Sequence, residues 1–186
     1  MYLVALERIL EVFLGTLLLI LGVFIPANFS IIDLNLNIYF LTLPISWQIP
    51  FAILIGMIFN KYSSITSVII YLLIGLLILP VFNEGGSIGY LITPNIGYLL
   101  GLIPAVFIIS SSSKETIYEY FISGVKGILI FHLIGICFLF IQKILIIRDI
   151  SIIRFIIIYT IKPLPFHLLM NTSCSIIAAI FKKGLK

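Results

Sequence analysis

The sequence predicts an all-α, polytopic membrane protein with six transmembrane helices in a compact bundle, a single domain over residues 1–186 and both termini in the cytoplasm. Hydrophobic residues make up 62% of the chain and charged residues 10%, and the mean hydropathy is +1.30. A soluble domain of this length needs more polar surface than such a composition supplies. The composition therefore indicates an integral membrane protein.

Six apolar segments approach the length of about 20 residues that a helix needs to cross the hydrocarbon core of a bilayer. They cover residues 9–27, 45–60, 64–82, 88–110, 124–147 and 166–181. The second and sixth are the shortest, and such segments cross where the bilayer thins or flanking side chains snorkel. The first leads into Pro26 and not into a small-residue cleavage site, so we interpret it as a retained helix.

A further apolar stretch, residues 149–162, lies between the last two predicted spans. It carries Arg154 and is stopped by Pro163 and Pro165. Proline cannot continue a regular helix, and a charged residue disfavours full burial in lipid. We therefore interpret this stretch as an interfacial or packed helix.

The basic residues near the predicted helix ends indicate the orientation of the chain. With a cytoplasmic N-terminus, the outer loops 28–44 and 83–87 contain neither Lys nor Arg. Seven basic residues then lie inside: Arg8, Lys61, Lys114, Lys126, Lys182, Lys183 and Lys186. The last outer connection disagrees, since it carries Lys143, Arg148, Arg154 and Lys162. This topology accounts for the net charge of +4, and the scattered basic residues form no nucleic-acid-binding motif.

The sequence carries no pattern typical of an enzyme, a metal site or a resident cofactor. Cys137 and Cys174 lie in apolar segments without CxxC or CxH spacing. No Gly-Lys-Ser or Gly-Lys-Thr follows the glycines, so the chain does not hydrolyse ATP by itself. We interpret His132 and His167 as isolated residues, each packed and hydrogen-bonded and not a proton relay or ligand. No catalytic triad, carboxylate pair or histidine cluster supports enzyme chemistry.

The first polar group of interest precedes the second predicted helix. Ser46, Trp47 and Gln48 stand there between two prolines. An indole and an amide in this place can contact a ligand. Alternatively, Trp47 is an anchor at the membrane interface and Gln48 a residue of the helix end.

The second polar group interrupts an apolar run at residues 83–98. It contains Asn83, Gly85, Gly86, Tyr90, Asn95 and Tyr98. Glycines allow the backbone to approach a ligand, and Pro94 with Gly97 can break the fourth helix at membrane depth. Transporters use such broken helices to expose backbone groups to a substrate. The alternative is a glycine-rich turn in which Asn95 bonds to a neighbouring helix. Asn171 in the last helix likewise either joins helices or touches a substrate.

Two stretches closely resemble the BioY family, the biotin-binding membrane component of energy-coupling-factor vitamin transporters. Residues 71–101 are similar to the family's tyrosine, LPVF and GGYLLG stretch, through Leu79-Pro80-Val81-Phe82, Gly85-Gly86 and Gly97-Tyr98-Leu99-Leu100-Gly101. Ser46-Trp47-Gln48 is similar to the family's Thr-Leu-Gln at the start of helix two. A cyanobacterial-type subgroup shares the Ser-Trp-Gln form. The resemblance covers most of the chain, from the first helix to the C-terminus.

The resemblance implies six helices in the cell membrane, biotin bound in a pocket closed by outer loops, and work with a transmembrane coupling protein and cytoplasmic ATPases. Biotin needs amides for its ureido ring, apolar walls for its rings and chain, and donors for its carboxylate. The candidate amides are Gln48, Asn83, Asn95 and Asn171. The candidate walls are Trp47, Tyr90 and Tyr98, and the backbone at Gly85 and Gly86 is the candidate anion cradle.

The chain departs from the family pattern on the last helix, where Asn171 and Cys174 occupy the positions of an aspartate and a lysine. The biotin carboxylate is thereby left without an evident cation. Two rival interpretations remain open, a subunit for another vitamin and a structural membrane protein without a small ligand. For docking of the coupling partner, the first helix offers Ala5, Gly15 and Gly22 as small residues that permit close helix approach.

Overall fold

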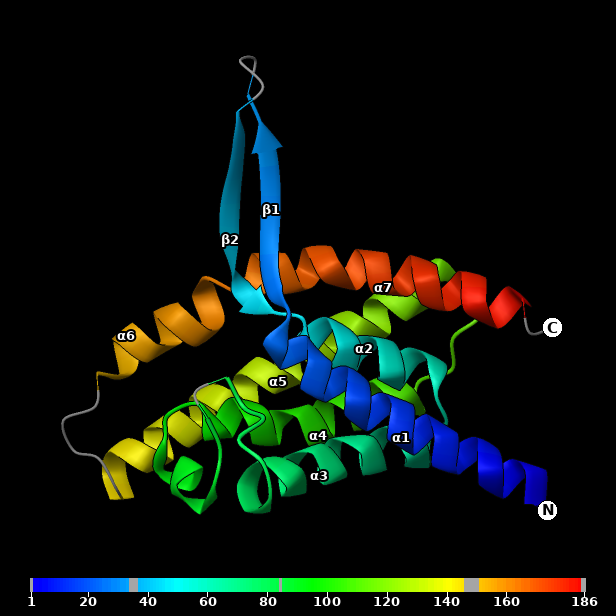
Figure 1. The fold of residues 1–186 in the computed structure, drawn as a ribbon, viewed down its shortest axis with the longest axis horizontal. Coiled ribbons are helices and arrows are strands. Elements are labelled where there is room, and N and C mark those ends of the chain that lie inside the picture. The colour runs from blue at the N-terminus through cyan, green and yellow to red at the C-terminus, as the bar shows by residue number, and fades with distance from the viewer. Residues whose placement is uncertain (1, 34–36, 84, 146–150, 185–186) are drawn as a thin grey trace.

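The computed structural model describes residues 2–33, 37–83, 85–145 and 151–184. Helices form the body of the protein, and one β-hairpin projects from it (Figure 1). The elements in chain order are α1 (Tyr2–Phe24), β1 (Pro26–Ile32), β2 (Ile38–Ser46), α2 (Gln48–Ile58), α3 (Lys61–Leu77), η1 (Ile88–Ile92), α4 (Ile96–Ser111), α5 (Ile117–Leu145), α6 (Ile152–Ile156), η2 (Ile157–Ile161) and α7 (Leu164–Gly184).

The helical fold is confirmed, because each of the six predicted spans overlaps one of six helices of 11 residues or more in the described part of the chain. Several helices begin earlier than predicted, and two of them end earlier, ahead of a proline. Helix α1 ends at Phe24 and not at residue 27, and α3 ends at Leu77 and not at residue 82. Pro26 and Pro80 follow these ends, and a residue before proline is disfavoured in helical conformation.

The hairpin corrects the assignment of residues 28–44 to a loop, within a fold that is otherwise helical as predicted. Strand β1 pairs antiparallel with β2, with Ser30 opposite Phe40. At its tip the Asn37 backbone N–H donates to Oδ1 of Asp33 at 3.0 Å. Asp and Asn between two runs of β-branched and aromatic residues are a hairpin signal. Strand β1 carries Asn28 and Ser30 in alternation with apolar residues, so part of the signal was present in the sequence.

The predicted break in the fourth helix is confirmed. A 3₁₀ turn, η1, is separated from α4 by Thr93, Pro94 and Asn95. The exposed backbone at the break finds partners within the protein, since Gln142 of α5 donates from Nε2 to the Thr93 carbonyl oxygen at 2.7 Å. This satisfies the requirement that polar backbone between apolar segments be hydrogen-bonded.

The stretch predicted as an interfacial or packed helix forms the short helix α6 and the π-helical turn η2. Residues 149 and 150 of that stretch lie outside the described residues. Pro163 then starts a change of direction into α7, and the His167 N–H donates to the Pro163 carbonyl at 2.9 Å. The junction of α6, η2 and α7 lies beside the base of the hairpin (Figure 1).

Within the described part of the chain, two helical segments are long and apolar enough to cross a membrane, Ile117–Leu145 and Ile152–Gly184. Helices α2, α3 and α4 are apolar but shorter. Helix α1 begins and α7 ends at the same end of the bundle (Figure 1). The two chain ends thus lie on one side of the helical body.

Helices α4 and α5 pack closely because glycines face aromatic rings. A Cβ added at Gly97 would lie 2.3 Å from Cβ of Phe138, and one at Gly135 would lie 2.3 Å from Cδ1 of Tyr98. Small residues at a helix interface allow the backbones to approach. This packing fixes the position of Tyr98 on the inner side of α4.

The predicted docking face on the first helix is wrong for two of its three residues. A Cβ at Gly15 would lie 2.4 Å from Oγ of Ser67, and one at Gly22 would lie 2.8 Å from the backbone nitrogen of Gln48. Both glycines therefore serve the packing of α1 on α3 and α2. Ala5 is exposed.

Candidate functional site

A cavity of about 570 Å³ lies between the base of the hairpin, the break before α4 and the junction of α6, η2 and α7. Its size falls in the range of pockets that hold small molecules. Polar and aromatic groups from distant parts of the chain line it: Ser46, Gln48, Asn83, Asn95, Tyr98, Phe131, Tyr159, Lys162 and His167. The remaining described lining is apolar except for backbone groups, and includes Leu43 and Leu99.

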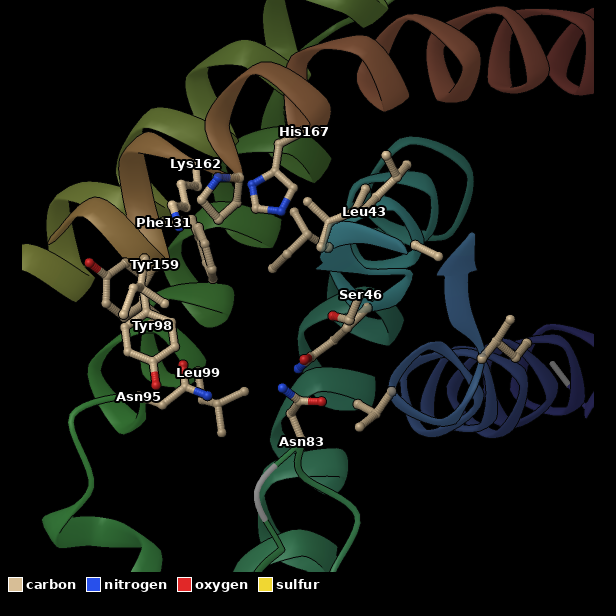
Figure 2. Close-up of a pocket in the computed structure, with 18 of the residues that line it drawn as sticks. Leu43, Ser46, Asn83, Asn95, Tyr98, Leu99, Phe131, Tyr159, Lys162 and His167 are labelled. Carbon is tan, nitrogen blue, oxygen red and sulfur yellow. The ribbon is translucent and has the colours of Figure 1, made fainter. Parts of the chain in front are cut away.

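Three amide side chains reach this cavity. Gln48 donates from Nε2 to the hydroxyl of Tyr71 at 3.1 Å, and Asn95 donates from Nδ2 to the hydroxyl of Tyr90 at 2.9 Å. These buried tyrosines hold the amides in fixed orientations. Asn83 follows the last apolar residue of the chain segment after α3, and it faces Asn95 across the cavity (Figure 2).

One wall of the cavity is aromatic. The ring centroid of Tyr98 lies 5.7 Å from that of Phe131 and 5.5 Å from that of Tyr159. The hydroxyl of Tyr98 also lies 2.8 Å from Oγ1 of Thr160. The wall therefore joins α4, α5 and η2, and it offers flat apolar surfaces to a ring or an alkyl chain.

The end of the cavity opposite the asparagines is formed by Lys162 and His167 and is called the nitrogen-rich end below. Lys162 and His167 lie together there, beside the start of α7 (Figure 2). Lys162 is the only charged side chain in the described lining. The two histidines are packed and hydrogen-bonded as predicted, but they are not isolated. Nε2 of His132 lies 3.2 Å from Nδ1 of His167, and their ring centroids lie 5.3 Å apart.

Four of the nine residues predicted for the site line the cavity: Gln48, Asn83, Asn95 and Tyr98. The expectation that the loop before the second helix approaches the glycine-rich loop is thus confirmed. The alternative for Asn95, a bond to a neighbouring element, is also met in part by its bond to Tyr90. Both roles are compatible, since only one amide hydrogen is needed for that bond.

Five predicted residues do not line the cavity: Trp47, Gly85, Gly86, Tyr90 and Asn171. Trp47 packs on Phe51, with ring centroids 6.2 Å apart. Tyr90 is buried against Phe82 and supports Asn95 from behind. Asn171 is fully buried and donates to the Phe121 carbonyl oxygen at 3.0 Å, so it joins α7 to α5.

Gly85 and Gly86, the predicted anion cradle, form a turn beside the end of α3. The Gly85 N–H donates to the Phe82 carbonyl oxygen at 3.0 Å and closes a tight turn. Gly86 packs against the end of α3, where a Cβ would lie 2.6 Å from the Gly75 carbonyl oxygen. Neither glycine is among the described residues that line the cavity, and their role as an anion cradle stays a prediction.

Sequence reasoning missed the nitrogen-rich end. Lys162 looked like a basic residue at the membrane surface, and the 35 positions between His132 and His167 conceal their contact. The one available signal was the pair of prolines, Pro163 and Pro165, which predicted a change of chain direction beside Lys162. A turn of that kind folds η2 and α7 around the end of a cavity.

Comparison with known proteins places these residues in a family. The sequence model of the BioY family matches residues 6–186. The chain is 34% identical over 96 residues to the biotin transporter BioY of Thermotoga maritima, a match over 50% of this chain and 57% of that protein. It is 29% identical over 102 residues to a protein named probable biotin transporter BioY from Lysinibacillus sphaericus, over 53% and 52% of the two chains. The chain thus spans about half the length of the biotin transporters that it matches.

Two further similarities extend over almost the whole chain. An uncharacterized 21.2 kDa protein from the psbX-ycf33 intergenic region of Cyanophora paradoxa is 27% identical over 187 residues, 95% of either chain. The fold is similar to the solved structure of the S-component for biotin from an ECF-type ABC transporter, with a TM-score of 0.70 and 16% identity over 96% of this chain and 92% of that chain. Since the family model covers nearly all of the sequence, this chain belongs to the BioY family.

Proposed function

We propose that this chain is the membrane-embedded, substrate-binding subunit of a biotin uptake system, and that it captures biotin at the outer face of the cell membrane. The observation that carries the proposal is the cavity of about 570 Å³, which combines amides, an aromatic wall and one lysine in a BioY-family chain. Membership of that family and the names of the bacterial relatives support biotin as the ligand.

The cavity matches the chemistry of biotin group by group. Amides of Gln48, Asn83 and Asn95 suit the ureido ring, which has both hydrogen-bond donors and an acceptor. The rings of Tyr98, Phe131 and Tyr159 suit the thiophane ring and the valeryl chain.

The subunit acts with partners in our proposal. Nothing in its sequence binds and hydrolyses ATP, so a transmembrane coupling protein and cytoplasmic ATPases supply the energy. Similarity to the S-component of an ECF-type ABC transporter supports this division of labour. We further propose that the chain crosses the plasma membrane several times in contact with lipid and keeps both termini in the cytoplasm, in line with the common side of its two chain ends.

Titration calorimetry of the detergent-purified chain with biotin tests the proposal. We expect a dissociation constant in the micromolar range or below, the affinity typical of preformed pockets that bury a small ligand. Ser46→Trp should abolish binding by filling the cavity that Ser46 lines. Ser113→Trp is the matched control, because Ser113 is exposed in the connector before α5.

The rival interpretations give different results in the same experiment. Binding of riboflavin or thiamine in place of biotin would indicate a subunit for another vitamin. If biotin, riboflavin and thiamine all fail to bind while the helical content is intact, a structural membrane protein is favoured. Biotin binding that survives Ser46→Trp would contradict the assigned cavity.

A further inference from the structure

The nitrogen-rich end of the cavity, formed by Lys162 and His167, has a composition that favours an anion. The described lining contains one lysine and no Asp or Glu, so a bound anion meets no like charge. Lys162 lies directly before Pro163, where the chain turns from η2 into α7, and His167 follows on the first turns of α7. Asn83 and Asn95 lie at the other end (Figure 2). The two ends of the cavity therefore differ, with a cation at one end and neutral amides at the other.

The hydrogen bond between the two histidines determines what His167 offers to the cavity. His132 and His167 are 4% and 3% exposed, and Nε2 of His132 lies 3.2 Å from Nδ1 of His167. In a neutral pair, one of these two nitrogens donates and the other accepts. Nδ1 of His132 is buried and has no hydrogen-bond partner among the described residues.

The unpartnered nitrogen selects one of the two arrangements. If His167 donated from Nδ1, His132 would carry its proton on the buried Nδ1 as a donor without an acceptor. Buried N–H groups without partners are rarer than unpaired acceptors. His132 is thus expected to donate from Nε2, which leaves His167 with its proton on Nε2. His167, the member of the pair that lines the cavity, then presents a donor to it.

We propose that Lys162 and His167 form the subsite for the carboxylate of the ligand, with His132 as a positioning residue that fixes the tautomer of His167. This inference rests on the proposed function and adds the direction in which biotin lies. The ammonium group of Lys162 and the Nε2–H of His167 bind the carboxylate, and the ureido ring reaches the amides of Asn83 and Asn95. Lys162 thereby supplies the cation that the last helix lacks at Cys174.

Calorimetry with biotin and biotin methyl ester tests the role of Lys162. The ester keeps the ureido ring and removes the negative charge. The wild type should bind biotin about 10-fold or more tightly than the ester, the effect of one charge-assisted hydrogen bond. Lys162→Met should lower biotin affinity by the same factor and leave ester affinity unchanged, which also shows that the variant is folded. Lys143→Met, at the exposed end of α5, is the matched control and should leave both affinities unchanged.

The outcomes of this experiment distinguish failure of the carboxylate subsite from failure of the proposed biotin binding. If the wild type binds biotin but Lys162→Met binds it equally well, or if the ester binds as tightly as biotin, the carboxylate subsite is overturned and biotin binding stands. If the wild type binds neither compound, both proposals fail.

The positioning role of His132 has its own readout. The ¹⁵N chemical shifts of the imidazole nitrogens should show the proton of His167 on Nε2 in the wild type. His132→Leu should lose this fixed tautomer and bind biotin about 5-fold to 10-fold more weakly, with no change for the ester. His132→Gln should restore biotin binding, because its amide N–H can take the place of the imidazole Nε2–H. A proton on Nδ1 of His167 in the wild type would overturn the role of His132.

Discussion

The hydroxyl oxygen of Tyr98 lies 2.8 Å from Oγ1 of Thr160, and this contact ties α4 to the π-helical turn that precedes Lys162. Tyr98 and Thr160 are 62 positions apart in the chain. The bond is buried, so neither hydroxyl can turn to water if the other is removed. It thereby fixes the separation between the aromatic wall and the nitrogen-rich end of the cavity.

Removal of either hydroxyl should therefore destabilise the protein by about 1 kcal/mol, the usual net value of such a bond. The changes are Tyr98→Phe and Thr160→Val, measured as the free energy of unfolding in detergent. The double variant should cost little more than one single variant, because both remove the same interaction. Thr172→Val is a control, since Thr172 is exposed and bonds only within its own helix. Strictly additive losses would show that the two hydroxyls do not act as a pair.

Gly135→Ala should change both stability and binding, although Gly135 does not line the cavity. The new Cβ would lie 2.3 Å from the Tyr98 ring, so the ring must move. Overpacking of this kind costs about 1–3 kcal/mol, and displacement of the ring into the cavity should weaken biotin binding. Gly184→Ala is the matched control, because no atom lies within 4 Å of its added Cβ. If the variant has the unfolding free energy and the biotin affinity of the wild type, α4 and α5 can move apart without a loss of stability.

Asn95→Ala should weaken biotin binding, whereas Asn171→Ala should lower the stability of the fold. Asn95 lines the cavity, so its loss should weaken biotin binding by roughly 1–3 kcal/mol through an unpaired ligand group. Asn171 is fully buried outside the lining, so its loss should lower the stability by about 1–3 kcal/mol and leave biotin affinity within about 2-fold. Calorimetry and thermal unfolding of the same two samples decide this. A large loss of affinity in Asn171→Ala would restore Asn171 to the ligand-binding residues.

Gly85→Ala should destabilise the turn that positions Asn83. Gly85 has φ of +116°, a conformation that L-residues rarely adopt, while no atom lies within 4 Å of an added Cβ. The cost is therefore conformational and of order 1–3 kcal/mol. Gly89→Ala should be nearly neutral, since its nearest neighbour would be Oγ of Ser87 at 3.5 Å. Equal unfolding free energies for the two variants would refute the conformational explanation.

The sequence predicted the helices and part of the site for different reasons. Long apolar segments reveal helices because the requirement for length and hydropathy is local. The break at Pro94 was equally visible, since proline acts on its own backbone. Asn95 and Gln48 were found because a polar residue next to a long apolar segment is conspicuous in the sequence itself.

The remainder depends on contacts that no local pattern encodes. Asn171 and Asn95 are alike as asparagines in apolar surroundings, and only the packing of α7 against α5 directs Asn171 away from the cavity. His132 and His167 meet through the same packing. Lys162 reaches the cavity because η2 is held by Tyr98, a contact between segments far apart in the chain. The hairpin was assigned to a loop although Asn28 and Ser30 alternate with apolar residues in β1, since an alternation over so few residues is a weak signal.

The lining of the cavity extends from Val23 to His167, which has a consequence for the biosynthesis of the protein. During synthesis the hairpin, α2 and α4 emerge long before α7, so a nascent or truncated chain has the rim and one wall of the cavity without its nitrogen-rich end. Only a chain that has been synthesised through α7 can enclose a ligand. A ligand that binds the finished fold and not its precursors stabilises it by mass action. Biotin in the medium would then favour survival of completed chains over those whose insertion stopped early.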